Sequence, residues 1–173
     1  MDLHDAIEFI RPAIPEAKAE SAWADLGSGS GLFTRALATL VGRGSTIHAV
    51  DRSRQKMLPS FNGNTIVFHQ LDFSKDTLPF AGLDGILMAN SIHFVKDKRS
   101  LLTRLRQTLR HEGRLLVIEY ELEKGNEWVP YPIPYEALAL LLTDSGFSEV
   151  SRIGERHSVY GSRKMYACTA LNS

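Results

Sequence analysis

The feature that most constrains the fold is an alternation of two hydrophobic periods along the chain. Short runs rich in Val, Ile and Leu alternate with longer runs whose apolar residues recur every three or four positions. The short runs predict β-strands, and the longer ones predict amphipathic helices. Because the middle strands are nearly continuous in apolar residues, we expect a parallel sheet covered on both faces. The expected strands span residues 21–26, 45–51, 65–72, 83–90, 113–121, 149–155 and 163–170.

Helix-like runs occupy the connections at 30–40, 99–110 and 134–147. A further helix is expected after Asp51, with Ser53 as its N-cap. The repeated order of strand, helix and strand implies right-handed crossovers and an open, doubly wound α/β sheet. The last two strands are joined by RHSVYGS, which is too short for a crossover helix, so they are expected to pair antiparallel at one edge.

Composition restricts the class of protein. The 173 residues carry 20 basic and 20 acidic side chains, and this balance gives no overall field that attracts nucleic acid or anionic lipid. A single cysteine, Cys168, excludes an internal disulfide framework and fits a reducing compartment. No apolar run is long enough to span a bilayer, and the start MDLHDAIEF lacks the features of a signal peptide. We therefore expect one cytoplasmic domain, residues 1–173.

Residue spacing disfavours two further kinds of partner. The six histidines and the one cysteine show no H-E-x-x-H or C-x-x-C spacing, so no metal site is expected. Basic residues between 96 and 114, Arg104 among them, surround an apolar stripe of Leu101, Leu105 and Leu109. No aromatic residues interleave them to stack on bases. They predict a solvated helix face rather than a surface for nucleic acid.

The turn DLGSGSG at 25–31 lies between the first expected strand and the first expected helix. In a doubly wound sheet, ligands bind beyond the carboxyl ends of the strands, where this turn is placed. Gly27 permits a tight turn, Gly29 leaves the backbone open to a ligand, and Gly31 lets the helix pack against the strand. The dinucleotide pattern G-x-G-x-x-G fails because Leu32 stands at its third glycine, and a P-loop is absent.

What remains is Asp25, two residues before Gly27, followed by glycines at alternate positions. This resembles the first motif of the class I S-adenosylmethionine-dependent methyltransferases. The seven expected strands, with an antiparallel C-terminal strand, look like the Rossmann-like sheet of that family over nearly the whole chain. The chain is similar to the small-molecule type that includes the ubiquinone and menaquinone biosynthesis enzymes. Those relatives usually have more helices before the first strand, which enclose the substrate. Two alternatives follow for this chain: the pocket is open and accepts a large substrate, or another subunit closes it.

The resemblance implies which residues bind S-adenosylmethionine. Asp51 ends the second strand, where the family has an acid that accepts hydrogen bonds from both ribose hydroxyls, and Arg52 flanks the adenine or is merely solvated. Asp72 and Phe73 correspond to the adenine site, although Phe73 also fits as a core aromatic. Asn90 ends the fourth strand, where the main-chain carbonyl meets the ammonium of the methionine part. The expected cofactor-binding residues are Asp25, Gly27, Ser28, Gly29, Asp51, Arg52, Asp72, Phe73 and Asn90.

The implied reaction is the in-line transfer of a methyl group to a small-molecule acceptor, with S-adenosylhomocysteine as the product. The cofactor supplies the reactive group, so the protein mainly positions the acceptor. A general base helps where the acceptor carries a proton that must leave. The candidate catalytic residues are His93, three residues after Asn90, and Tyr131 in the proline-rich insert at 123–134. Weaker candidates for the same pocket are Glu119, which is otherwise a solvated carboxylate, Trp128, Tyr160 and Arg163.

Several alternatives stay open at this point. An oxidoreductase that uses NAD on a related sheet is one, and a non-catalytic S-adenosylmethionine-binding module that serves a partner is another. The sequence NSIHF stands where methyltransferases of nucleobase amines and glutamine amides have an Asn-Pro-Pro-aromatic motif, which disfavours those acceptors. The accepting atom and any homo-oligomer are left undetermined.

Overall fold

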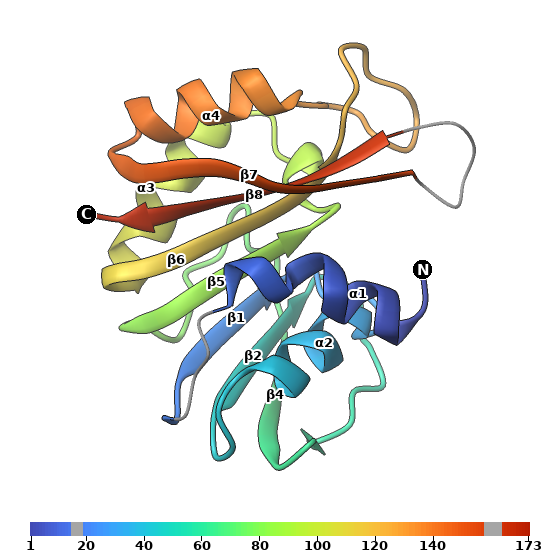
Figure 1. The fold of residues 1–173 in the computed structure, drawn as a ribbon, viewed down its shortest axis with the longest axis vertical. Coiled ribbons are helices and arrows are strands. Elements are labelled where there is room, and N and C mark those ends of the chain that lie inside the picture. Colours follow the sequence, from blue (N-terminus) through green and yellow to red (C-terminus); the bar gives the residue numbers. More distant parts are fainter. Residues whose placement is uncertain (15–18, 158–163) are drawn as a thin grey trace.

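The computed structural model describes residues 1–14, 19–157 and 164–173 of the chain. In these residues the chain builds an eight-stranded sheet of order β3-β4-β2-β1-β5-β6-β8-β7 (Figure 1). The strands are β1 (Ala22–Leu26), β2 (Thr46–Asp51), β3 (Ser60–Phe61), β4 (Asn64–Gln70), β5 (Leu83–Ala89), β6 (Leu109–Tyr120), β7 (Phe147–His157) and β8 (Lys164–Asn172). The helices are α1 (Leu3–Ile10), α2 (Leu32–Leu40), α3 (Lys98–Thr108) and α4 (Tyr135–Asp144), with single 3-10 turns η1 (Arg11–Ala13) and η2 (Ile92–Phe94).

The strand pairing confirms the expected doubly wound α/β architecture. β4, β2, β1, β5 and β6 pair in parallel with one another, whereas β8 is antiparallel to both β6 and β7. The antiparallel pair at one edge is therefore as expected. The strand count differs, because the two-residue β3 pairs antiparallel with the start of β4 and adds an eighth strand to the seven that were expected.

The prediction of a helix after Asp51 is wrong, since no helix forms between β2 and β4. The Ser53 N–H donates to Asp51 Oδ1 at 2.8 Å and closes a turn instead of starting a helix. The stretch 53–58 is too short for a stable helix, and its apolar residues Met57 and Leu58 are adjacent, so it has no apolar stripe to bury. The chain instead turns into β3.

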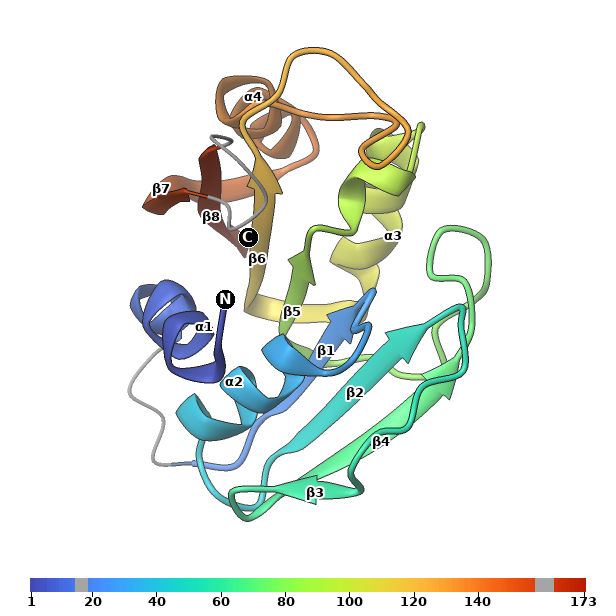
Figure 2. The same ribbon diagram turned by 90° about the vertical axis from the view of Figure 1, so that its right-hand side faces the viewer.

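Two apolar cores hold the sheet, one on each face. α1 and α2 cover one face, and α3 and α4 cover the other (Figure 2). Ile86 and Leu87 are adjacent in β5 and both fully buried, Ile86 in the core under α3 and α4 and Leu87 in the core under α1 and α2. Each such side chain contributes about 1.5–3 kcal/mol by leaving water. Burial on both faces explains why the middle strands are continuous in apolar residues.

A pair of histidines lies on the face of β2 and β4 opposite α2. His48 Nδ1 and His69 Nε2 are 3.0 Å apart, and Phe80 stacks on His48 with ring centroids at 4.4 Å. Burial lowers the pKa of both imidazoles below the usual value, and His69 adds to this effect at His48. A hydrogen bond between two imidazoles needs at least one neutral ring, so the folded state favours the uncharged forms.

This pair is expected to make the fold sensitive to acid. Folded-state pKa values below the unfolded ones give stability that is complete above about pH 6.5 and is lost as the pH falls. Replacing His48→Gln should reduce the loss of unfolding free energy between about pH 7.5 and about pH 5, as measured by chemical denaturation. The exposed His111, changed to Gln, is the control, and an identical pH dependence in the two variants would contradict the assignment.

Candidate active site

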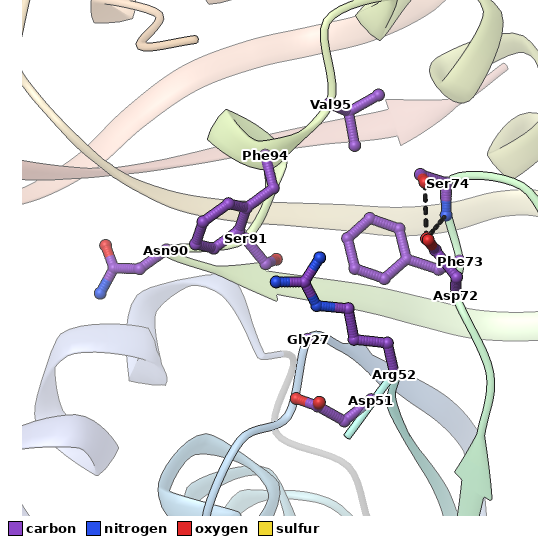
Figure 3. A pocket seen from close by; sticks show the side chains of 10 residues that line it. All are labelled: Gly27, Asp51, Arg52, Asp72, Phe73, Ser74, Asn90, Ser91, Phe94 and Val95. Carbon is purple, nitrogen blue, oxygen red and sulfur yellow. Dashed lines mark hydrogen bonds between the residues drawn. The ribbon is translucent and has the colours of Figure 1, made fainter. Parts of the chain in front are cut away.

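A cleft opens at the carboxyl ends of β1, β2, β4 and β5 (Figure 3). Six of the nine expected cofactor-binding residues line it; of the remaining three, Asp25 lies near the end of β1, and Ser28 and Gly29 lie in the β1–α2 turn. The cleft therefore gathers residues from segments far apart in the sequence. Its lining residues are Gly27, Asp51, Arg52, Asp72, Phe73, Ser74, Asn90, Ser91, Phe94 and Val95.

The glycine turn is held against the end of β2 by its own backbone. The N–H groups of Gly27 and Ser28 both donate to the carbonyl of Val50, at 2.8 and 2.9 Å. At Gly27, with φ +84°, an added Cβ would lie 2.5 Å from the Cβ of Ser91, so both the conformation and the space require glycine. Gly29 has φ +49°, and an added Cβ would meet nothing within 4 Å. The space beside Gly29 is therefore open.

Gly31 has a different neighbour from the one expected. It is the N-cap of α2 with φ +81°, and an added Cβ would lie 2.5 Å from Met57 Sδ. The expected close approach of α2 to β1 at this position is therefore wrong. Met57 belongs to the connection that was expected to be a helix, and its extended path brings the thioether over the turn.

The carboxylate of Asp51 is fixed by two backbone donors. Its Oδ2 accepts from the Gly29 N–H at 2.9 Å, and its Oδ1 accepts from the Ser53 N–H at 2.8 Å. Each carboxylate oxygen has a second lone pair and accepts further hydrogen bonds. Beside it, Figure 3 shows Arg52 extending across the cleft, with its guanidinium 5.9 Å from the ring centroid of Phe94.

Asp72 and Phe73 form the far wall of the cleft. Asp72 Oδ1 accepts from the N–H and the hydroxyl of Ser74, at 2.9 and 2.5 Å. Burial acts to raise the pKa of Asp72, but the hydrogen bonds from Ser74 outweigh it and lower that pKa below the usual value. Phe73 belongs to the core under α3 and α4 and also lines the cleft. Its environment is therefore compatible with both interpretations, a core aromatic and a residue of the adenine site.

Polar atoms without partners gather at this cleft. Three of the four buried side-chain polar atoms that lack a hydrogen bond in the described part of the chain belong to Asp25, Ser28 and Asn90, at the ends of β1 and β5. An unsatisfied buried group costs about 1–3 kcal/mol. Asn90 is also held at φ +52°, a conformation uncommon outside glycine. Unpaired acceptors, an unpaired hydroxyl and a strained backbone together indicate a place for a polar ligand.

Asp25 is the most perturbed of these groups. Its Oδ2 accepts from the Thr34 hydroxyl at 2.6 Å, whereas its Oδ1 has no partner. Burial, with a smaller contribution from the negative charge of Asp51, raises the pKa of Asp25 to about 7. A cation placed next to Oδ1 would stabilise the ionised carboxylate.

The two candidate catalytic residues do not line this cleft, although they are close to one another. His93 is buried in η2, and its Nδ1 lies 2.9 Å from both carboxylate oxygens of Glu119. Glu119 is fully buried in β6 and also accepts the backbone N–H groups of His93 and Tyr120, at 3.2 and 3.1 Å. The alternative of a solvated Glu119 is therefore wrong. An acid inside the apolar run LLVIEY already indicated a buried partner.

The proline-rich insert is attached to η2 by its main chain. The Tyr131 N–H donates to the carbonyl of His93 at 3.0 Å, and Lys98 Nζ donates to the carbonyls of Tyr131 and Val95, at 2.7 and 2.8 Å. Burial lowers the pKa of this lysine, although the charge of Glu119 opposes the shift. In Figure 2 the insert, between β6 and α4, runs over the same end of the molecule as the β5–α3 connection.

The remaining candidates contribute less to the site. Trp128 is 77% exposed and packs against no core. Tyr160 and Arg163 lie outside the described residues. In the ranges that the structure describes, no group of three or more His, Cys, Asp and Glu side chains is placed to hold a metal ion. The described helices include none that is long and apolar enough to cross a membrane.

The sequence pattern of a family described as a methyltransferase domain matches residues 24–115, which is more than half of the chain. The chain belongs to this family. The matched segment contains the glycine turn, Asp51, Asp72 and Asn90. The protein is thus a class I S-adenosylmethionine-dependent methyltransferase rather than an NAD-type oxidoreductase, and no finding singles out the ubiquinone type.

Solved structures share the fold. YcgJ from Bacillus subtilis has a TM-score of 0.74 at 12% identity, covering 97% of this chain and 98% of that one. A 1,6-didemethyltoxoflavin-N1-methyltransferase from Burkholderia thailandensis has a TM-score of 0.72 at 18% identity, covering 98% and 77%. An S-adenosylmethionine-dependent methyltransferase from Aquifex aeolicus has a TM-score of 0.68 at 16% identity and covers both chains fully, at 100%. No curated protein sequence matches the chain.

The buried carboxyl of Asp25 is expected to destabilise the unliganded protein at neutral pH. A carboxyl whose pKa rises from 3.8 to about 7 on folding gives stability that is lost between those values as the pH rises. Asp25→Asn should remove this slope and raise the unfolding free energy at about pH 8 by up to about 4 kcal/mol, measured by chemical denaturation. Asp144→Asn, at an exposed carboxylate, is the control. Parallel pH profiles for wild type and Asp25→Asn would contradict the prediction.

Proposed function

We propose that this methyltransferase binds S-adenosylmethionine in the cleft and transfers its methyl group to a small-molecule acceptor. The observation that carries the proposal is the set of unpaired buried atoms at the glycine turn. An α-amino acid group has an ammonium and a carboxylate, and it needs both acceptors and a donor. Asp25 and Asn90 offer unpaired acceptor oxygens, and Ser28 offers an unpaired hydroxyl, all beside the glycine turn.

The rest of the cleft suits an adenosine group. Asp51 presents a fixed carboxylate with lone pairs to spare, which fits the two hydroxyls of a ribose. Asp72 is held ionised by Ser74, so it accepts a hydrogen bond from an exocyclic amine. The rings of Phe73 and Phe94, with the guanidinium of Arg52, provide flat surfaces for a base. The bound S-adenosylmethionine would supply an electrophilic methyl group on a sulfonium.

Glu119 supports a catalytic role for His93. With Nδ1 as the donor in its bond to the Glu119 carboxylate, a neutral imidazole keeps the lone pair of Nε2 free. Nε2 would then accept a proton from the acceptor, while the acceptor atom bonds to the methyl carbon and the bond from that carbon to the sulfonium sulfur breaks. His93 precedes Phe94 of the cleft wall, and Tyr131 is bonded to its carbonyl. In this proposal Tyr131 borders the acceptor, and Lys98 holds the insert in place.

The second part of the proposal concerns the methyl acceptor, which we propose is a small molecule. The structural neighbour from Burkholderia thailandensis is described with bound 1,6-didemethyltoxoflavin and S-adenosylhomocysteine, and the first of these is a small molecule. The absence of an Asn-Pro-Pro-aromatic motif after β5 also disfavours nucleobase amines. The cytoplasmic location, the single domain over 1–173 and any homo-oligomer stay predictions.

The assigned ribose site gives the first test. Asp51→Asn should weaken binding of S-adenosylhomocysteine by about 1–3 kcal/mol, because it loses the charge that orients the Gly29 N–H and the ribose hydroxyls. Isothermal titration calorimetry measures this, with NADH as a ligand that should not bind. Asp144→Asn should leave the affinity unchanged. Equal affinity in the Asp51 variant, or binding of NADH alone, would refute the assigned site.

The proposed base gives the second test. His93→Gln should lower turnover of a methyl acceptor by about 10²–10⁴-fold while S-adenosylhomocysteine binds within about twofold of wild type. Methyl transfer from isotopically labelled S-adenosylmethionine to a metabolite mixture provides the assay, and His111→Gln is the matched control. Undiminished transfer by the His93 variant would remove this residue from the mechanism, and cofactor binding without any transfer would favour a non-catalytic module.

A further inference from the structure

The loop that carries Asp72 and Phe73 is attached to α3 by one side chain. The guanidinium of Arg104 donates to the main-chain carbonyls of Phe73 at 3.0 Å, Ser74 at 2.8 Å and Asp76 at 3.4 Å. Arg104 is half-buried rather than on a solvated face, so the sequence-based expectation for this residue is wrong. Its neighbour on the same helix, Arg99, does lie on the exposed face and pairs with Asp144 there.

The other polar contacts of this loop are local. The Asp72 N–H donates to Asp76 Oδ2 at 2.7 Å, and the N–H groups of Lys75 and Asp76 donate to the Asp72 carbonyl at 3.0 and 2.8 Å. Together with the two bonds from Ser74 to the Asp72 carboxylate, these make the segment a compact turn. Local bonds fix the shape of the turn but not its position relative to the sheet. The bonds from Arg104, which come from α3, fix that position together with the packing of Phe73 in the core.

We propose that Arg104 is a positioning residue for the adenine end of the cofactor. This inference rests on the proposed function, because it assumes that Asp72 and the adjacent main chain contact the base. A planar guanidinium with donors on both sides spans neighbouring carbonyls, which a lysine ammonium on a flexible stem does not reproduce. By holding the loop in place before binding, Arg104 reduces the ordering that the ligand would otherwise impose.

The proposal separates the two ends of the ligand. Arg104 acts on the wall formed by Asp72 and Phe73, whereas Asp25 acts at the glycine turn. Loss of Arg104 should therefore weaken any ligand that contains adenine, with or without an amino-acid tail. Loss of the Asp25 charge should weaken only ligands that have the tail. This difference distinguishes local positioning from a general loss of structure.

The test compares Arg104→Ala, Arg104→Lys, Arg99→Ala and Asp25→Asn by calorimetry with two probes, S-adenosylhomocysteine and 5′-methylthioadenosine, which lacks the amino-acid tail. Arg104→Ala should raise the Kd of both probes by about tenfold, and Arg104→Lys should raise both by a smaller factor. Asp25→Asn should raise the Kd of S-adenosylhomocysteine alone, and Arg99→Ala should stay within about twofold of wild type. Hydrogen exchange of Arg104→Ala should accelerate at residues 72–76 and stay unchanged in β5 and β6.

Three results would overturn the inference. Wild-type affinity for both probes in both Arg104 variants would show that the loop keeps its position without the guanidinium. Faster exchange across β5 and β6 as well, with Arg104→Lys as impaired as Arg104→Ala, would show a general structural role. A wild-type protein that binds neither probe would refute the proposed function itself, and this outcome is visible before any variant is measured.

Discussion

The site depends on the hydrogen bonds that attach the glycine turn to the end of β2. Gly27 and Ser28 donate to Val50, and Gly29 donates to the Asp51 carboxylate, so the turn after β1 and the acid after β2 are built as one unit. Two of the three donors, Gly27 and Gly29, have positive φ, a conformation that only glycine adopts readily. They also leave the remaining lone pairs of Asp51 for a ligand. Without this attachment, the glycine turn would have no fixed position beside the Asp51 carboxylate.

Much of the fold follows from hydrophobic periodicity, and its failures have local causes. The parallel core strands and the antiparallel edge pair were predictable because burial on both faces, or a connection too short for a helix, leaves a clear pattern in the sequence. The stretch 53–58 has a capping signal at its start, Ser53, but no apolar stripe, and a helix without a face to bury is not stabilised. The two-residue β3 is too short to leave any periodic signal.

The site was predictable to the extent that its residues follow strand ends. Asp51, Asp72 and Asn90 each come directly after or at the end of a strand, so topology alone places them at one edge of the sheet. Lys98 and Arg104 could not be found in this way, because they bind main-chain carbonyls, which every residue carries. A donor whose partner is backbone leaves no complementary residue type in the sequence. Glu119, by contrast, has the His93 side chain as a partner. The apolar run LLVIEY around Glu119 indicates that this acid is buried.

The bond between His93 and Glu119 also constrains how this sequence can change. Replacing either residue alone would leave a buried charge or ring nitrogen without its partner, which is costly inside a protein. Replacing both by apolar side chains of similar volume removes the unpaired side chain, although the backbone N–H of His93 still loses its bond to the Glu119 carboxylate. The two positions are therefore expected to vary together over evolutionary time, and a descendant that has lost the imidazole should have lost the carboxylate as well.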